Sequence, residues 1–245
     1  MGRWCSFAPA HLMFSPLLRG VVFRSKGGSM KLVVFGASGA TGRHVVRIAG
    51  ATGWSVVAFA RTQAAAMDVA GEHEPMVGNP TELADVTKAV RGADAVAVCL
   101  GISRLTRSPF AALVSPPDLT SRSVDAIVLA LKNEHVRRIV YVSAFGAADS
   151  WARMPWWGRL FIQISKVRHS MADHTRSEQL LRASGLDWTA LRPVLLDDAP
   201  SALSAAPMGL DGPRLAKVSR EALARTVVHV LRDGATFGQA IGLEG

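Results

Sequence analysis

The chain has 245 residues, of which 49% are hydrophobic and 19% are charged. This balance is typical of a folded globular unit and excludes an intrinsically disordered chain. No stretch reaches the ~18 uninterrupted apolar residues that indicate a membrane span, and two cysteines, Cys5 and Cys99, are too few for a disulfide framework.

The formal net charge of +9 is not a nucleic-acid signal. Residues 1–29 contain no acid and supply four of the positive charges, from Arg3, Arg19, Arg24 and Lys26. The remaining cations are scattered, and no basic motif is interleaved with aromatic residues. We therefore expect no nucleic-acid partner, because an anionic cofactor or an acidic substrate explains the bias equally well.

Residues 1–29 precede the first strand-like segment and end in a Gly-Gly-Ser linker, and Met30 follows at the point where the fold begins. We favour a disordered leader translated from an early start codon. A transit peptide is the second interpretation, since the segment bears arginines and serines but no acid; a secretory signal fits least, because Pro16 and Arg19 interrupt its apolar stretch. We expect one domain over residues 30–245 and a cytoplasmic location, with organellar import through residues 1–29 as the alternative.

Three glycines follow the first apolar run. Residues 32–35 are predicted to form a buried strand, Gly36, Gly39 and Gly42 come next, and an amphipathic segment at 44–49 is predicted to be a helix. A strand that enters a helix through closely spaced glycines is how a dinucleotide pyrophosphate is held. The spacing Gly-x-x-Gly-x-x-Gly differs from that of lactate-type dehydrogenases.

Strand-like and helix-like segments then alternate. The predicted strands are 54–60, 75–77, 93–100, 138–143, 188–191 and 237–243, and the predicted helices are 81–91, 119–133, a long helix ending near 183, and 219–231. This alternation predicts the α/β class and a single Rossmann-type, doubly wound parallel sheet covered by helices on both faces. Ligands of such sheets bind outside the carboxyl ends of the strands.

The second strand ends in Arg61-Thr62. An acid at this place would accept hydrogen bonds from the ribose hydroxyls of NAD, whereas a cation and a hydroxyl suit a 2′-phosphate. Arg43, directly after the last motif glycine, is a second candidate cation. The sequence therefore predicts that NADP(H) is preferred over NAD(H); the alternative is that Arg61 is a solvated loop residue.

The ends of the next three strands complete the predicted groove. Gly78 and Asn79 are expected beside the adenine, where Asn79 supplies an edge hydrogen bond. Leu100 and Gly101 end the fourth strand and leave space for the cofactor to pass, and Ser143 ends the fifth strand.

These motifs resemble the atypical short-chain dehydrogenase/reductase group that includes NmrA-like proteins and the flavin reductase/biliverdin reductase B type. The matching pieces are at residues 34–42, 60–62, 77–79, 141–146 and 180–193. The resemblance implies NAD(P) binding on a Rossmann fold. It also implies which residues hold the cofactor: the pyrophosphate is held by Gly36, Ser38, Thr41 and Gly42, and the nicotinamide lies near Arg192, Pro193 and Val194.

The chain departs from ordinary short-chain dehydrogenases at the catalytic pair. Those enzymes use Tyr-x-x-x-Lys, in which the lysine lowers the pKa of the tyrosine. Here Ser170 and His174 stand at the corresponding positions, and the only tyrosine, Tyr141, lies in the fifth strand. The sequence therefore predicts tyrosine-independent chemistry. Ser143 and His174 are the candidate catalytic residues, and Asp173 is a further candidate for proton transfer. The alternative for His174 is a surface position on a long helix.

We predict an NADPH-dependent oxidoreductase that reduces a flat or conjugated small-molecule acceptor, such as a flavin or a quinone, without a metal site. A non-catalytic NADP(H)-binding sensor, regulator or assembly factor is the alternative, and an isomerase or epimerase is a third, weaker interpretation. Residues 102–117 are expected to form a lid-like loop. Residues 151–161 are rich in tryptophan. These tryptophans are expected either to line the acceptor pocket or to pack the segment onto the sheet or against a partner.

Overall fold

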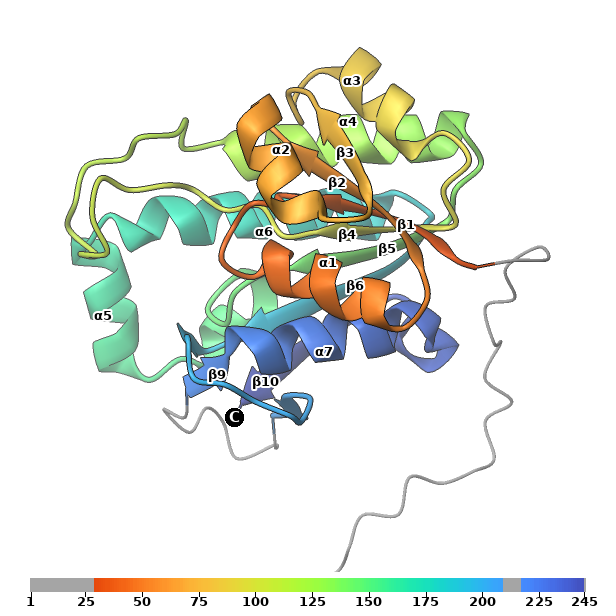
Figure 1. Ribbon diagram of the computed structural model, residues 1–245. Helices are drawn as coiled ribbons and strands as arrows, with labels where there is room; N and C mark the ends of the chain where they lie inside the picture. The colour runs from red at the N-terminus through yellow and green to blue at the C-terminus, as the bar shows by residue number, and fades with distance from the viewer. Residues whose placement is uncertain (1–28, 209–216, 245) are drawn as a thin grey trace, which may run out of the picture.

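The computed structural model describes residues 29–208 and 217–244 (Figure 1). The predicted leader, residues 1–29, therefore lies outside the described part except for Ser29. The hydroxyl of Ser29 donates to the carbonyl oxygen of Gly53 and accepts a hydrogen bond from the backbone N–H of Ser55.

The described residues form ten strands and seven α-helices. The strands are β1 (Lys31–Phe35), β2 (Ser55–Ala60), β3 (Glu74–Val77), β4 (Ala95–Val98), β5 (Arg138–Val142), β6 (Asp187–Pro193), β7 (Leu195–Asp197), β8 (Ala206–Pro207), β9 (Lys217–Ser219) and β10 (Gln239–Glu244). The α-helices are α1 (Gly42–Ala51), α2 (Gln63–Ala70), α3 (Leu83–Val90), α4 (Leu119–Asn133), α5 (Trp156–Ile164), α6 (Val167–Ala183) and α7 (Arg220–Arg232). Two 3₁₀ turns, η1 (Ala148–Arg153) and η2 (Gly234–Thr236), complete the set.

The main sheet has the order β3-β2-β1-β4-β5-β6-β10-β8, and every neighbouring pair is parallel except β10 with β8. The chain builds outward from β1 through β2 to β3, and then returns to β4 on the other side of β1. The strand order thus reverses between β1 and β4, and a doubly wound sheet binds ligands at this point. The predicted Rossmann-type parallel sheet is confirmed.

Helices cover both faces of the sheet (Figure 1). Helices α1 and α7 pack with the side chains of Leu32 and Val34 in one core, whereas α3, α4 and α6 pack with Val33 and Phe35 in the other. Because β1 is buried on both faces, its sequence is a continuous apolar run and not an alternation of polar and apolar residues. The buried strand holds the following glycine turn in place.

The structure adds elements that the sequence did not reveal. Helix α2 buries only Ala66 and Ala70 and therefore has little apolar periodicity. The strands β7, β8 and β9 have two or three residues each, too few to show a repeat. Among the described residues, no helix is both long and apolar enough to cross a membrane.

Candidate functional site

The turn after β1 is built so that only glycine fits. Gly36 has a φ of +77°, and a Cβ there would lie 2.7 Å from the carbonyl oxygen of Cys99. A Cβ at Gly42 would lie 2.1 Å from the carbonyl oxygen of Gly36, and one at Gly39 would lie 3.1 Å from the same atom. The three glycines therefore let the turn, the start of α1 and the end of β4 approach each other closely.

This turn aims the N-terminus of α1 at the carboxyl edge of the sheet. Thr41 is the N-cap residue, yet no side chain caps the helix. The first turn of a helix presents backbone N–H groups without partners inside the helix, together with a partial positive charge. A glycine cradle of this shape, which a Cβ would fill, fits a pyrophosphate.

A cavity of about 130 Å³ lies against the cradle at the reversal between β1 and β4. It brings together six predicted cofactor residues: Gly36, Ser38, Gly39, Arg61, Leu100 and Gly101. Cys99 lines the same cavity, and burial raises the pKa of its thiol to about 12. Cys99 is therefore a neutral, space-filling side chain below the cradle.

A second cavity of about 410 Å³ adjoins the first and shares Arg61 and Leu119 with it. Gly78 and Asn79 line it, and so does Arg122 from the first turn of α4. Arg61 and Arg122 give this end of the groove two exposed cations. These two cations outnumber the one acid that lines the cavity, Glu82, and favour an anionic group there.

Three of the predicted residues, Thr62, Asn79 and Arg43, form hydrogen bonds within the protein. The hydroxyl of Thr62 caps α2 by accepting from the N–H of Ala65 at 3.3 Å. The side-chain oxygen of Asn79 accepts from the backbone N–H of Thr81 at 3.1 Å and thereby fixes the turn after β3. Arg43 donates to the carbonyl oxygen of Ser38 at 3.3 Å, and its side chain also lines a separate cavity between α1 and α2.

Beyond β4, the structure brings Ser143 beside β6. The backbone N–H of Ser143 donates to the carbonyl oxygen of Leu191 at 2.8 Å, and that of Phe145 donates to Pro193 at 3.0 Å. Ser143, Arg192 and Pro193 are therefore neighbours, and the half-buried Val194 follows them. None of these four residues lines the two cavities described above.

A buried ion-pair cluster holds these residues in place. Glu178 of α6 accepts from the hydroxyl of Ser143 at 2.7 Å and from Nε of Arg192 at 2.9 Å. Arg192 also pairs with Asp149 at 2.7 Å, and Asp149 pairs with Arg182 at 2.8 Å. The side chains of Arg192 and Glu178 are 4% and 0% exposed, so each charge depends on its partner.

The pKa shifts follow from these contacts. The hydrogen bond from Arg192 outweighs burial and lowers the pKa of Asp149 to about 2. Burial alone would lower the pKa of Arg192, but the hydrogen bonds and charges of Glu178 and Asp149 outweigh burial and raise it. Arg192 and Asp149 are therefore both charged at neutral pH.

Tyr141 and His174 form a second pair on the same face of β5. The hydroxyl oxygen of Tyr141 lies 2.5 Å from Nδ1 of His174. Burial raises the pKa of Tyr141 well above its usual value and lowers the pKa of His174. The tyrosine is therefore the donor and Nδ1 of the neutral imidazole the acceptor, which assigns the imidazole proton to Nε2.

Asp173 has a structural partner. Its two carboxylate oxygens accept from the backbone N–H groups of Thr120 and Ser121 at 2.8 and 2.9 Å. A carboxylate at this place complements the N-terminus of α4. The contact docks α6 on the start of α4, whose Leu119 lines the cavity beside the glycine cradle.

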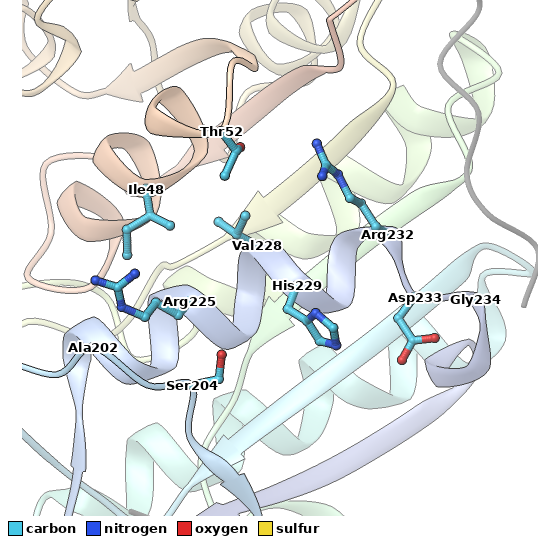
Figure 2. A pocket seen from close by; sticks show the side chains of 10 residues that line it. All are labelled: Ile48, Thr52, Ala202, Ser204, Arg225, Val228, His229, Arg232, Asp233 and Gly234. Atoms are coloured by element: carbon cyan, nitrogen blue, oxygen red, sulfur yellow. The ribbon is translucent and has the colours of Figure 1, made fainter. Parts of the chain in front are cut away.

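Larger cavities lie elsewhere. One of about 630 Å³ lies between α1, α7 and residues 202–204 (Figure 2). Both helices end there at the amino ends of the strands, away from the glycine cradle. Two of its cations already have partners, because Arg225 pairs with Glu221 at 3.0 Å and Arg232 stacks on Trp54 at 4.5 Å.

Sequence reasoning missed Arg122, Glu178 and Asp149. Arg122 lies one turn into a predicted helix that follows the fourth strand, so its place at the carboxyl edge was a usable signal. Glu178 is an acid three residues before the buried Leu181 of α6, and a buried helical position of this kind requires a cationic partner. No sequence signal marks Asp149.

A family model described as NAD(P)H-binding matches residues 36–234. The fold is also similar to several solved structures at low identity. A putative NAD-dependent epimerase/dehydratase from Bacillus halodurans has a TM-score of 0.71 and 20% identity, over 89% of this chain and 95% of that one.

Two further structures are similar over the same part of the chain. ChuY, an anaerobillin reductase from Escherichia coli O157:H7, has a TM-score of 0.72 and 20% identity over 88% of this chain and 97% of that one. A short-chain dehydrogenase/reductase from Veillonella parvula DSM 2008, in complex with NADP, has a TM-score of 0.69 and 19% identity over 88% and 94%.

Proposed function

Because this chain belongs to the NAD(P)H-binding family, we propose that it is an NADPH-dependent reductase of a flat or conjugated acceptor. The observation that carries this proposal is the glycine cradle at the β1–β4 reversal, continued by a groove that ends at two cations. The dinucleotide, when bound, supplies the hydride. ChuY, which has a similar fold, is a reductase, and this agrees with the proposed class of chemistry.

Arg61 and Arg122 support a preference for NADPH. Both line the cavity of about 410 Å³. No acidic residue directly follows β2, where an acid would bind the ribose of NAD. Each charge-assisted contact to a 2′-phosphate is worth about 1.5–3 kcal/mol, so a preference of about tenfold or more over NADH is expected.

The dissociation constants of NADPH and NADH test this preference. Arg61→Ala is expected to weaken NADPH binding about tenfold or more while leaving NADH binding nearly unchanged. Arg176→Ala, which removes an exposed cation from α6, is the matched control and should change neither constant. Equal affinities of the wild-type protein for the two cofactors would contradict the proposal.

The protonation of the Tyr141–His174 pair supports a mechanism without a catalytic tyrosinate. Tyr141 is fully buried and its raised pKa keeps its proton on the oxygen. The neutral His174 is then oriented by Tyr141, and its Nε2–H is the group of this pair that can donate to an acceptor or a cofactor hydroxyl. His174 is therefore proposed to orient and polarise the acceptor by donating a hydrogen bond from Nε2–H, and solvent supplies the proton that is transferred.

One observation favours the second candidate function, an NADP(H)-binding sensor. The hydroxyl of Ser143 already donates to Glu178, and the guanidinium of Arg192 is already paired with Glu178 and Asp149. These side chains position the ends of β5 and β6, and they are hydrogen-bonded or ion-paired with one another. A protein that only binds the cofactor needs no more than this.

Steady-state oxidation of NADPH against flavins, quinones and enals separates the two functions. A reductase should turn over at least one acceptor faster than about 0.1 s⁻¹, which is modest beside typical enzymes. His174→Ala should then lower kcat by about 10²-fold or less. NADPH binding without oxidation by any acceptor would favour the sensor.

A further inference from the structure

Helix α5 carries an apolar face that the described chain leaves largely exposed. Trp156, Trp157, Leu160, Phe161 and Ile164 are all exposed, and the exposed fraction of Trp156 is 75%. They recur at a helical spacing on one side of α5, whereas Gly158 and Ile162 on the other side are buried. Single exposed apolar residues are ordinary, but a contiguous aromatic patch of this kind marks an interaction surface.

The loop at residues 102–117 extends this face. A bridge between Arg104 and Leu113 folds the loop back on itself, and its tip rests on α5. Phe110 meets Phe161 edge-on with 6.2 Å between the ring centroids, and the backbone N–H of Lys166 donates to the carbonyl oxygen of Pro109 at 2.9 Å. Figure 1 shows this loop and α5 together at one side of the molecule, beyond the carboxyl ends of the strands.

Cations predominate around the face. Residues 99–117 and 150–172 contain six cations and no acid; the cations are Arg104, Arg107, Arg153, Arg159, Lys166 and Arg168. The guanidinium of Arg159 donates to the carbonyl oxygens of Ala152 and Met154, which are neutral groups. Arg107 is paired with Asp198 at 3.6 Å, whereas Arg104, Arg159, Lys166 and Arg168 have no ion pair within 4.0 Å among the described residues, so the surface keeps a net positive charge.

We propose that this surface, α5 together with the loop 102–117, docks on an anionic lipid bilayer. Exposed tryptophans and aliphatic residues beside Lys and Arg are the composition with which a short amphipathic helix enters the interface of a membrane. Each cation near an anionic surface adds to the attraction. A two-fold contact with a second copy would set the six cations against their own equivalents, which opposes self-association.

Flotation with vesicles tests the proposal on the full chain. The protein should float with vesicles of phosphatidylcholine and phosphatidylglycerol, and not with phosphatidylcholine alone. Binding should weaken as salt is raised, because salt screens exposed charges. The double variant Trp156→Ser/Ile164→Ser should lower the partition coefficient about tenfold or more, since two apolar side chains no longer enter the bilayer.

Two controls separate the surface from general effects. Met67→Ser/Leu203→Ser removes exposed apolar side chains elsewhere and should leave binding unchanged. Lys166→Gln/Arg168→Gln, which lies outside α5, should weaken binding to anionic vesicles several-fold, whereas Lys132→Gln on α4 should not. The charge variant tests the proposal even if the apolar variant fails to fold, as judged by its melting temperature.

Three results would overturn the proposal. They are no binding to anionic vesicles, equal binding to both kinds of vesicle, and unchanged binding by a folded Lys166→Gln/Arg168→Gln variant. A dimer detected by sedimentation that disappears in Trp156→Ser/Ile164→Ser would assign the face to a second copy instead. None of these measurements involves cofactor turnover, so the lipid proposal and the reductase proposal fail separately.

Discussion

Glu178 has a fully buried carboxylate whose partners, Ser143 and Arg192, end β5 and β6. Glu178→Gln would leave Arg192 with only Asp149 as a charged partner in a site where it is almost inaccessible to water. Breaking a buried pair in this way costs about 3–5 kcal/mol of folding free energy. Urea unfolding at neutral pH measures the loss.

Asp149 gives the matched comparison, because it pairs with the same guanidinium but its side chain is 69% exposed. Asp149→Asn should cost no more than about 1 kcal/mol, since water screens the exposed carboxylate and Arg192 keeps its pairing with Glu178. If both variants lose the same stability, burial is not what makes the Glu178 contact strong.

The lowered pKa of His174 predicts that the free energy of unfolding depends on pH. Burial lowers its pKa in the folded state, whereas the unfolded chain has the ordinary value of about 6.5. Below that pH the unfolded state binds a proton that the folded state does not, so the stability contributed by the neutral imidazole is present above about pH 6.5 and falls as the pH falls.

Urea unfolding between pH 7.5 and 5 measures the slope of the unfolding free energy against pH. One group contributes at most about 1.4 kcal/mol per pH unit to this slope. His174→Gln should remove that part of the slope. His229→Gln, at an exposed position of α7, should leave it in place. A slope that survives in His174→Gln would assign the proton to another group.

Between elements, Asp173 joins α6 to the N-terminus of α4. Asp173→Asn keeps the size of the side chain but removes the charge that two backbone N–H groups face. We expect a loss of about 1–2 kcal/mol, the usual worth of a helix cap. Asp125→Asn, at an exposed position of α4, should change stability by less than about 0.5 kcal/mol.

The close contact between the end of β1 and the start of α1 depends on glycine at position 42, which has no Cβ. Gly42→Ala places a Cβ 2.1 Å from the carbonyl oxygen of Gly36, so the start of α1 must move away, at a cost of about 2 kcal/mol or more. A Cβ at Gly101 meets nothing within 4 Å. Gly101→Ala should therefore keep the wild-type melting temperature, and equal losses in the two variants would contradict the close-approach argument.

At the scale of the whole molecule, the reversal of strand order between β1 and β4 places four of the proposed cofactor features at one edge of the sheet. The glycine cradle, Arg61, Asn79 and Gly101 come from four different strand ends, and parallel pairing brings those ends level. The same edge leads from β5 through η1 into α5, so the groove and the cationic apolar face lie on the same side of the molecule (Figure 1).

The sequence by itself determined the features that depend on local sterics and on regular burial. The apolar run of β1 and the three glycines predict the first strand, the turn and the start of α1. The alternation that follows predicts the parallel sheet, and hence that Arg61, Asn79 and Gly101 share its carboxyl edge. Helix α4 begins and ends at the predicted residues, 119 and 133.

Only the tertiary structure decided which side chains meet. Arg122 shares a cavity with Arg61, Glu178 pairs with Arg192, and Tyr141 pairs with His174, which lies 33 residues later in the chain. These contacts depend on how α4 and α6 are rotated and seated against β5 and β6. No local periodicity encodes that geometry, because it results from the packing of both cores together.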